Sequence, residues 1–157
     1  TSNYRRRAQF HHSIEESEIA ALDEARRNGR VTTFNGHHEV APGIEVIKIG
    51  GHTPGQSVVK VDTSEGAVLL ASDAIHYYEE YERDMPFAFL SSLLDTYIGF
   101  DCIRTMADAG EVQHIIAGHD PTTLDRLRAL PGARSPFPVG EFDGLAVSFG
   151  EISGVAS

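Results

Sequence analysis

Three apolar runs in this sequence each end in a turn that carries a histidine or an aspartate, and this arrangement restricts the fold more than any other feature. The runs cover residues 44–49, 67–71 and 114–117, and the turns are Gly51-His52-Thr53-Pro54-Gly55, Ser72-Asp73-Ala74 and Ala117-Gly118-His119-Asp120. Strands of one sheet bring the loops at their ends together on a rigid frame. We therefore expect His52, Asp73 and His119 to meet at one edge of a sheet, where imidazole and carboxylate groups suit a zinc-type ion.

The rest of the pattern alternates strands with helices, which is typical of an α/β layer architecture. Helices are predicted over 14–28, where Ser13 and Glu16 form a capping box, over 95–109 with Asp95 as N-cap, and after Asp120-Pro121. Strands are predicted over 44–49, 57–61, 67–71, 114–117 and 145–149, with a short β-prone run at 31–34 and a turn at 41–43. Residues 75–93 give no regular pattern. We expect a single domain over residues 1–157, with the strand at 67–71 covered on both faces because it is apolar throughout.

Each of the three positions also has a simpler explanation when it is considered alone. His52 fits an exposed residue of a capped turn, and Asp73 fits a cap on the loop that follows it. His119 fits a helix-entry histidine bonded to backbone, with Asp120 as the helix cap. The metal-site interpretation depends on the joint pattern.

Composition narrows the classes of partner. The chain has 157 residues and a formal net charge of −10, which argues against nucleic acid and against anionic membrane surfaces. No apolar run approaches the length of a membrane span. Cys102 is the one cysteine, so no internal disulfide can form. We expect a reducing, cytoplasmic location.

The joint pattern resembles the C-terminal half of the metallo-β-lactamase-fold hydrolases, and within them the N-acyl-homoserine-lactonase-like group. The motifs His52-Thr53-Pro54-Gly55, Ser72-Asp73-Ala74 and Gly118-His119-Asp120 carry this resemblance in order and spacing. Residues 40–44 and the run ending in Asp84-Met85-Pro86-Phe87 extend it to roughly residues 1–130. The resemblance implies one half of an αββα sandwich. Residues 131–157 match nothing in this pattern.

The resemblance implies a role for four residues. His52 would ligate the first of two divalent metal ions, expected to be zinc, Asp73 would bridge both ions, and His119 would ligate the second. The reaction would be cleavage of a lactone or ester by a metal-activated water, with Asp73 and His76 as the catalytic residues. His76 stands where the group carries a tyrosine that contacts the substrate carbonyl, so we expect it to donate a hydrogen bond there.

One part of the family pattern is missing from this chain. The His-x-His-x-Asp-His motif that supplies the remaining ligands does not occur, and the adjacent pairs His11-His12 and His37-His38 have the wrong spacing. We expect one bound metal ion or none, little activity of the chain alone, and pairing with an N-terminal half or a second copy. Two alternatives remain open, namely a glyoxalase-II-like thioesterase and a non-catalytic α/β interaction module on the same scaffold.

Overall fold

The computed structural model describes residues 15–128, in which the α/β architecture predicted from sequence is confirmed. The chain divides into two compact units on either side of the Phe34–Asn35 bond. The first contains helix α2 (Glu16–Arg27), and the second contains the sheet and the other helices. Helix α2 begins close to the predicted position. The N-cap of α2 is Glu15 and not the predicted Ser13. The predicted strand at 145–149 lies outside the described residues.

The second unit is built on a five-stranded sheet in the order β1-β2-β3-β4-β5. Strands β1 (His37–Ala41), β2 (Ile44–Lys48), β3 (Ser57–Thr63) and β4 (Gly66–Ser72) form an antiparallel meander. Strand β5 (His114–Ala117) then pairs parallel to β4. Because a parallel pair needs a crossover connection, the chain between β4 and β5 has room for two helices.

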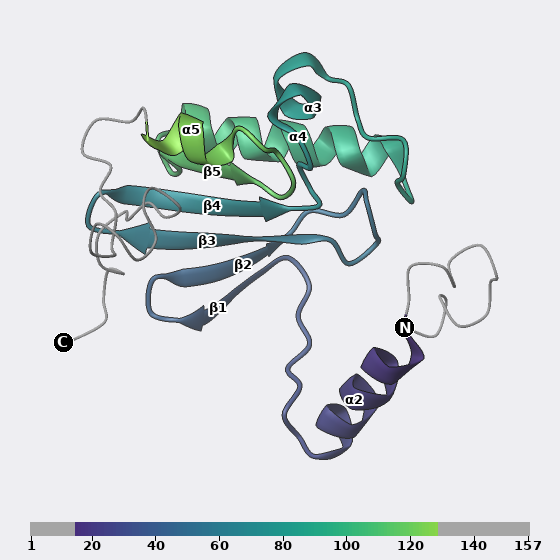
Figure 1. The fold of residues 1–157 in the computed structure, drawn as a ribbon. Helices are drawn as coiled ribbons and strands as arrows, with labels where there is room; N and C mark the ends of the chain where they lie inside the picture. The colour runs from purple at the N-terminus through teal and green to yellow at the C-terminus, as the bar shows by residue number, and fades with distance from the viewer. Residues whose placement is uncertain (1–14, 129–157) are drawn as a thin grey trace, which may run out of the picture. The chain divides into compact units, whose positions relative to one another are not determined.

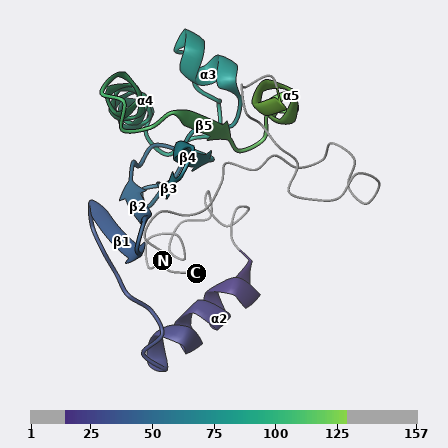
Figure 2. The same cartoon turned by 90° about the vertical axis from the view of Figure 1, so that its left-hand side faces the viewer.

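Three helices accompany the sheet, and both views place them towards its β4–β5 edge (Figures 1 and 2). They are α3 (Tyr78–Arg83), α4 (Leu93–Asp108) and α5 (Thr123–Arg128). Helix α3 lies in the segment predicted to be irregular. The prediction of Asp95 as N-cap is wrong, because the Ser92 side chain accepts a hydrogen bond from the Asp95 N–H and the helix begins at Leu93.

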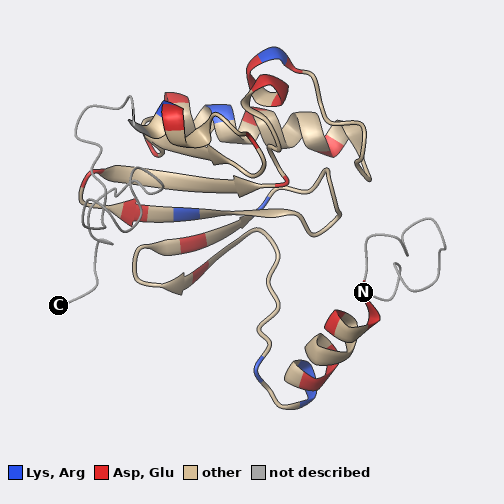
Figure 3. Cartoon of the chain, in the orientation of Figure 1, with Lys and Arg blue, Asp and Glu red and all other residues tan. Residues whose placement is uncertain are grey.

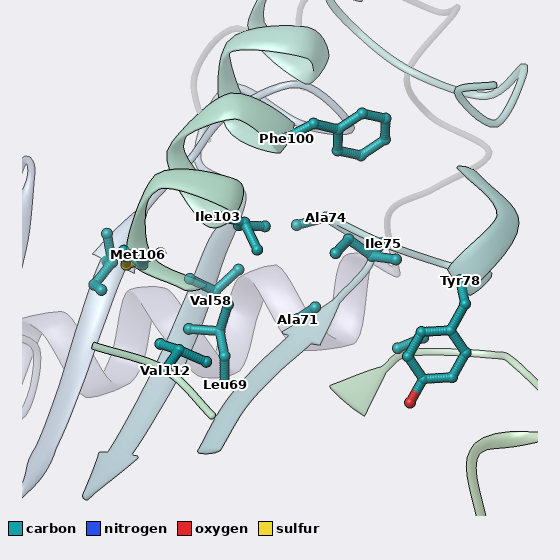
Figure 4. Packing of buried hydrophobic residues seen from close by; sticks show 12 residues of the cluster. Val58, Leu69, Ala71, Ala74, Ile75, Tyr78, Phe100, Ile103, Met106 and Val112 are labelled. Carbon is teal, nitrogen blue, oxygen red and sulfur yellow. The ribbon is translucent and has the colours of Figure 1, made fainter. Parts of the chain in front are cut away.

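The main core lies between α4 and one face of the sheet (Figure 4). Phe100, Ile103 and Met106 of α4 pack in one cluster with Val58 and Leu69 of the sheet. The spacing of the three helix residues follows the helical repeat, so one stripe of α4 is buried. This packing holds α4 against the strands whose ends carry the candidate site.

The opposite face of the sheet carries a second apolar row. Val46 pairs with Val59, and Val59 pairs with Leu70, so the three side chains share one face, because cross-strand partners point the same way. Leu70 is 43% exposed. The expectation that β4 is covered on both faces is therefore wrong at this residue.

The strands differ from expectation at two further places. Residues 31–34 form no strand, although Val31 and Phe34 favour one, since a strand forms only with a partner. Strand β1 was not predicted, because its exposed edge sequence His-His-Glu has no apolar alternation.

Lys and Arg are interspersed with Asp and Glu along the described helices, as Figure 3 shows. Among residues 15–128, the structure contains no helix with the length and apolar character needed to cross a bilayer.

Candidate metal site

The sheet brings His119 and Asp73 together through the parallel pairing of β4 with β5. Asp73 follows the last residue of β4, and His119 follows β5 by two residues. The two loops remain bonded beyond the strands, since the Gly118 N–H donates to the Ile75 carbonyl and the His119 N–H to the His76 carbonyl, both at 2.9 Å. The backbone thus places the two loops side by side.

Gly118 is required for this close approach of the two loops. A Cβ atom at this position would lie 2.6 Å from the Ser72 carbonyl oxygen and 3.1 Å from the Ser72 Cα. Backbone atoms cannot give way as a flexible side chain does, so only glycine fits. The glycine before His119 therefore sets how closely that loop approaches Asp73.

His52 reaches the same place from the loop between β2 and β3. Its Nε2 atom lies 3.9 Å from Oδ2 of Asp73, while Nε2 of His119 lies 2.8 Å from Oδ1. The Asp73 carboxylate thus faces a different imidazole with each of its two oxygens. The three residues predicted from sequence to form one site are brought together.

The His52 ring is held in a defined orientation by the backbone. Its Nδ1 atom lies 2.9 Å from the carbonyl oxygen of Phe89. Because a carbonyl can only accept, Nδ1 carries the proton and Nε2 of the neutral ring keeps its lone pair on the side of Asp73. Metal-ligating histidines are characteristically oriented by such a bond from the other ring nitrogen. Sequence patterns gave no signal for Phe89, because its contribution is a backbone carbonyl.

The donor types of the site suit a divalent metal ion, but their present arrangement is not that of a metal centre. Among residues 15–128, no group of three or more His, Cys, Asp or Glu side chains is arranged to hold an ion. The contact between His119 and Asp73 has the length of a direct hydrogen bond. In that bond Nε2 of His119 carries the proton, because an ionised carboxylate can only accept, so this nitrogen has to lose its proton before it can ligate an ion. The side chain of His119 is 59% exposed and that of Asp73 37%, so both have room to move.

His76 lies beside these residues, but it is buried. Its ring centroid is 4.9 Å from that of His52 and 5.6 Å from that of His119, and it packs on Phe87 at 4.5 Å. Its Nδ1 atom lies 3.3 Å from Oε2 of Glu80 on α3. Glu80 was missed by sequence analysis, although its position four residues after His76 is the spacing of contacts within a helical turn.

A small pocket with a cavity volume of about 10 Å³ lies beside the histidines. His52, Asp73, His76 and Glu80 contribute its polar lining, and Phe87 and Phe89 are among its apolar residues. A pocket with apolar walls and a few convergent polar groups is the usual form of a small-molecule site.

Asp120 is adjacent to His119 in sequence. Its carboxylate bonds to the surrounding loops and not to the three candidate ligands. Its carboxylate accepts hydrogen bonds from the N–H and hydroxyl of Thr122 and from the Tyr78 N–H. Burial pushes the pKa of the Asp120 carboxyl up, but these bonds and the charge of Arg126 outweigh it, so the pKa lies below its ordinary value. Helix α5 begins at Thr123, so Asp120 caps the turn that precedes the helix.

Comparison with known proteins finds N-acyl homoserine lactonases among the relatives of this chain. An N-acyl homoserine lactonase from a Bacillus species is 40% identical over 89 residues, which are 56% of this chain and 32% of the relative. The N-acyl homoserine lactonase of Bacillus thuringiensis is 29% identical over 101 residues, or 62% of this chain and 39% of the relative. The homologues of the present chain are N-acyl homoserine lactonases. The chain spans about a third to two fifths of the lengths of these relatives. No family model matches the chain.

The solved structures that match this chain include the same class of enzyme as the sequence relatives. An N-acyl homoserine lactone hydrolase, with the product N-hexanoyl-L-homoserine bound at its catalytic metal centre, matches with a TM-score of 0.55 and 25% identity. The match covers 64% of this chain and 38% of that structure. The structural neighbours have the metallo-β-lactamase fold, so the fold expected from the resemblance is confirmed over part of the neighbours' length.

Proposed function

We propose that this chain is part of a metal-dependent hydrolase that opens the lactone ring of N-acyl homoserine lactones. The observation that carries the proposal is the position of the Asp73 carboxylate between Nε2 of His52 and Nε2 of His119. This donor set stands on a scaffold whose homologues are lactonases.

In this proposal His52, Asp73 and His119 hold the metal, with zinc as the expected ion. When bound, such an ion polarises a carbonyl oxygen and activates a water molecule at neutral pH. His52 needs no rearrangement of its tautomer, because Nδ1 already carries the proton. His119 has to move its proton from Nε2 first, since that atom now donates the hydrogen bond to Asp73.

The lining of the pocket matches a substrate with a polar ring and an apolar chain, and its cavity volume of about 10 Å³ means that the surrounding loops have to open to admit one. Its polar residues gather around Asp73, and Phe87 and Phe89 provide apolar surface that is 42% and 46% exposed. In this proposal His76 contacts the substrate from the buried side of the pocket. The aromatic residues receive the acyl chain and limit the access of water.

Three ligands are fewer than a dinuclear centre requires, since catalytic zinc sites take about three protein ligands for each ion. We therefore propose that the remaining ligands come from protein outside this chain. The apolar row of Val46, Val59 and Leu70 supports this, because an apolar sheet face is normally covered by a partner layer. An N-terminal half or a second copy would provide that layer. A monodisperse 17.1 kDa monomer in light scattering would contradict both.

Zinc binding tests the function without depending on turnover. The chain is stripped with a chelator, and zinc affinity is then measured by calorimetry for the wild type and for H52A, D73A and H119A. We expect each substitution to weaken binding by roughly tenfold or more. H37A is the matched control, since His37 is exposed on β1 and bonds Glu45. Unchanged affinity in all three site variants would overturn the proposal. Hydrolysis of N-hexanoyl homoserine lactone by the chain alone is expected to be very slow.

A further inference from the structure

His76 and Glu80 form a buried pair beside the proposed metal ligands. They are the two polar or charged side chains that are buried among residues 15–128, with exposures of 7% and 6%. A buried carboxylate is costly unless hydrogen bonds satisfy it. Glu80 meets this need with both oxygens, since Oε1 accepts the Tyr77 N–H at 3.2 Å and Oε2 faces Nδ1 of His76 at 3.3 Å.

When Glu80 is ionised, this contact determines which nitrogen of a neutral His76 carries the proton. An ionised carboxylate has no proton to donate, so the nitrogen that faces it has to be the donor. The neutral ring then has its proton on Nδ1 and a lone pair on Nε2, which points away from Glu80. Packing against Phe87 and His52 restricts rotation of the ring.

We propose that Glu80 is a positioning residue that fixes His76 in the Nδ1–H tautomer, so that Nε2 accepts a hydrogen bond from an N–H or O–H group of the substrate. The inference rests on the proposed function for the identity of that substrate, which carries an amide N–H. It reverses the polarity expected from sequence, where His76 takes the place of a hydrogen-bond donor. The pocket would thus recognise a ligand by its donor group at this position.

The tautomer can be measured on this chain without metal and without activity. We would record long-range ¹H–¹⁵N spectra of the ¹⁵N-labelled chain with a chelator present, at about pH 8.5, where an ordinary imidazole is neutral. The H76Q variant assigns the His76 signals by their loss. The expected result is a protonated Nδ1 and an unprotonated Nε2. A proton on Nε2 in the wild type overturns the inference, and this result does not depend on how any variant folds.

The variant E80Q tests the role of the carboxylate. Its amide oxygen can still accept the Tyr77 N–H, while its NH₂ group replaces the acceptor that faces Nδ1. We expect His76 to change to the Nε2–H tautomer. E79Q is the control, because Glu79 lies next in the helix but pairs with Arg83 at the surface, and its His76 signals should match the wild type. An unchanged tautomer in folded E80Q would overturn the inference while leaving the metal-site proposal intact.

Discussion

Nε2 of His119 lies 2.8 Å from Oδ1 of Asp73, although the two residues are 46 positions apart in the chain. The contact exists because β4 and β5 run parallel as neighbours, and their last residues lead into adjacent loops. A hydrogen bond between exposed groups adds little stability by itself. We therefore expect this pair to affect metal binding more than stability.

Replacing Asp73 by asparagine should separate metal binding from stability. D73N keeps the size of the side chain and one acceptor for His119, so we expect the free energy of unfolding to change by less than about 1 kcal/mol. Zinc affinity should fall, because a neutral amide is a poor ligand in place of a carboxylate. Urea unfolding and zinc calorimetry measure the two effects. D62N is the control, since Asp62 pairs with Lys60 on β3. Equal zinc affinities for D73N and D62N would contradict this prediction.

Substitution of Gly118 should disturb the same pair through the backbone. In G118A the new Cβ would meet the Ser72 carbonyl at 2.6 Å, so the loop that carries His119 has to shift. We expect a loss of about 1–3 kcal/mol in the free energy of unfolding, as for other overpacked sites, together with weaker zinc binding.

G55A is the matched control for G118A, because nothing lies within 4 Å of a Cβ at Gly55 and that glycine lies in the loop that carries His52. Its unfolding free energy and zinc affinity should stay close to those of the wild type. If G118A were as stable as G55A, the close approach of the two loops would not require glycine.

The convergence of His52, Asp73 and His119 could be predicted from sequence because each follows an apolar run. Apolar runs indicate where strands lie, and the Gly, Pro, Asn or Asp residues that follow them indicate where loops begin. The surroundings of the site could not be predicted in the same way. The Phe89 carbonyl that orients His52 is a backbone group, and no residue type marks it. The bond from Glu80 to His76 depends on α3, a six-residue helix that is too short for a clear periodic pattern.

The errors at the edges of the fold have a common cause. Residues 31–34 have β-prone side chains but no neighbouring strand, whereas the polar edge strand β1 forms because β2 lies beside it. Strand formation depends on pairing more than on intrinsic preference. Which segments pair depends on the tertiary fold, so a short stretch of sequence does not predict it.

Substitution of Gly99 would test how closely α4 packs against Ile49, the residue that follows β2. A Cβ at Gly99 would lie 2.3 Å from Cγ2 of Ile49, although alanine in a helix interior normally gains about 1 kcal/mol over glycine. We expect the clash to win and G99A to lose about 1–3 kcal/mol of unfolding free energy. The double variant G99A/I49A should lose less than the sum of the two single variants. Additive losses in urea unfolding would mean that Ile49 is not what excludes a side chain at Gly99.

The contribution of Asp120 to the free energy of unfolding should depend on pH and disappear in acid. The pKa of its carboxyl is lowered in the folded protein, with burial opposing and the Thr122 and Tyr78 hydrogen bonds favouring the ionised form. A lowered pKa means that the unfolded chain binds the proton more readily. The stabilisation is therefore fully present above the ordinary carboxyl pKa of about 4 and is lost as the pH falls through the lower folded value. We expect D120N to unfold more easily than the wild type at pH 6 with a chelator present. The difference should shrink steadily in urea titrations below about pH 4.

D125N, in the first turn of α5, is the comparison for D120N. A D120N deficit that stays constant down to pH 2 would show that the charge of Asp120 is not what stabilises the turn beside His119.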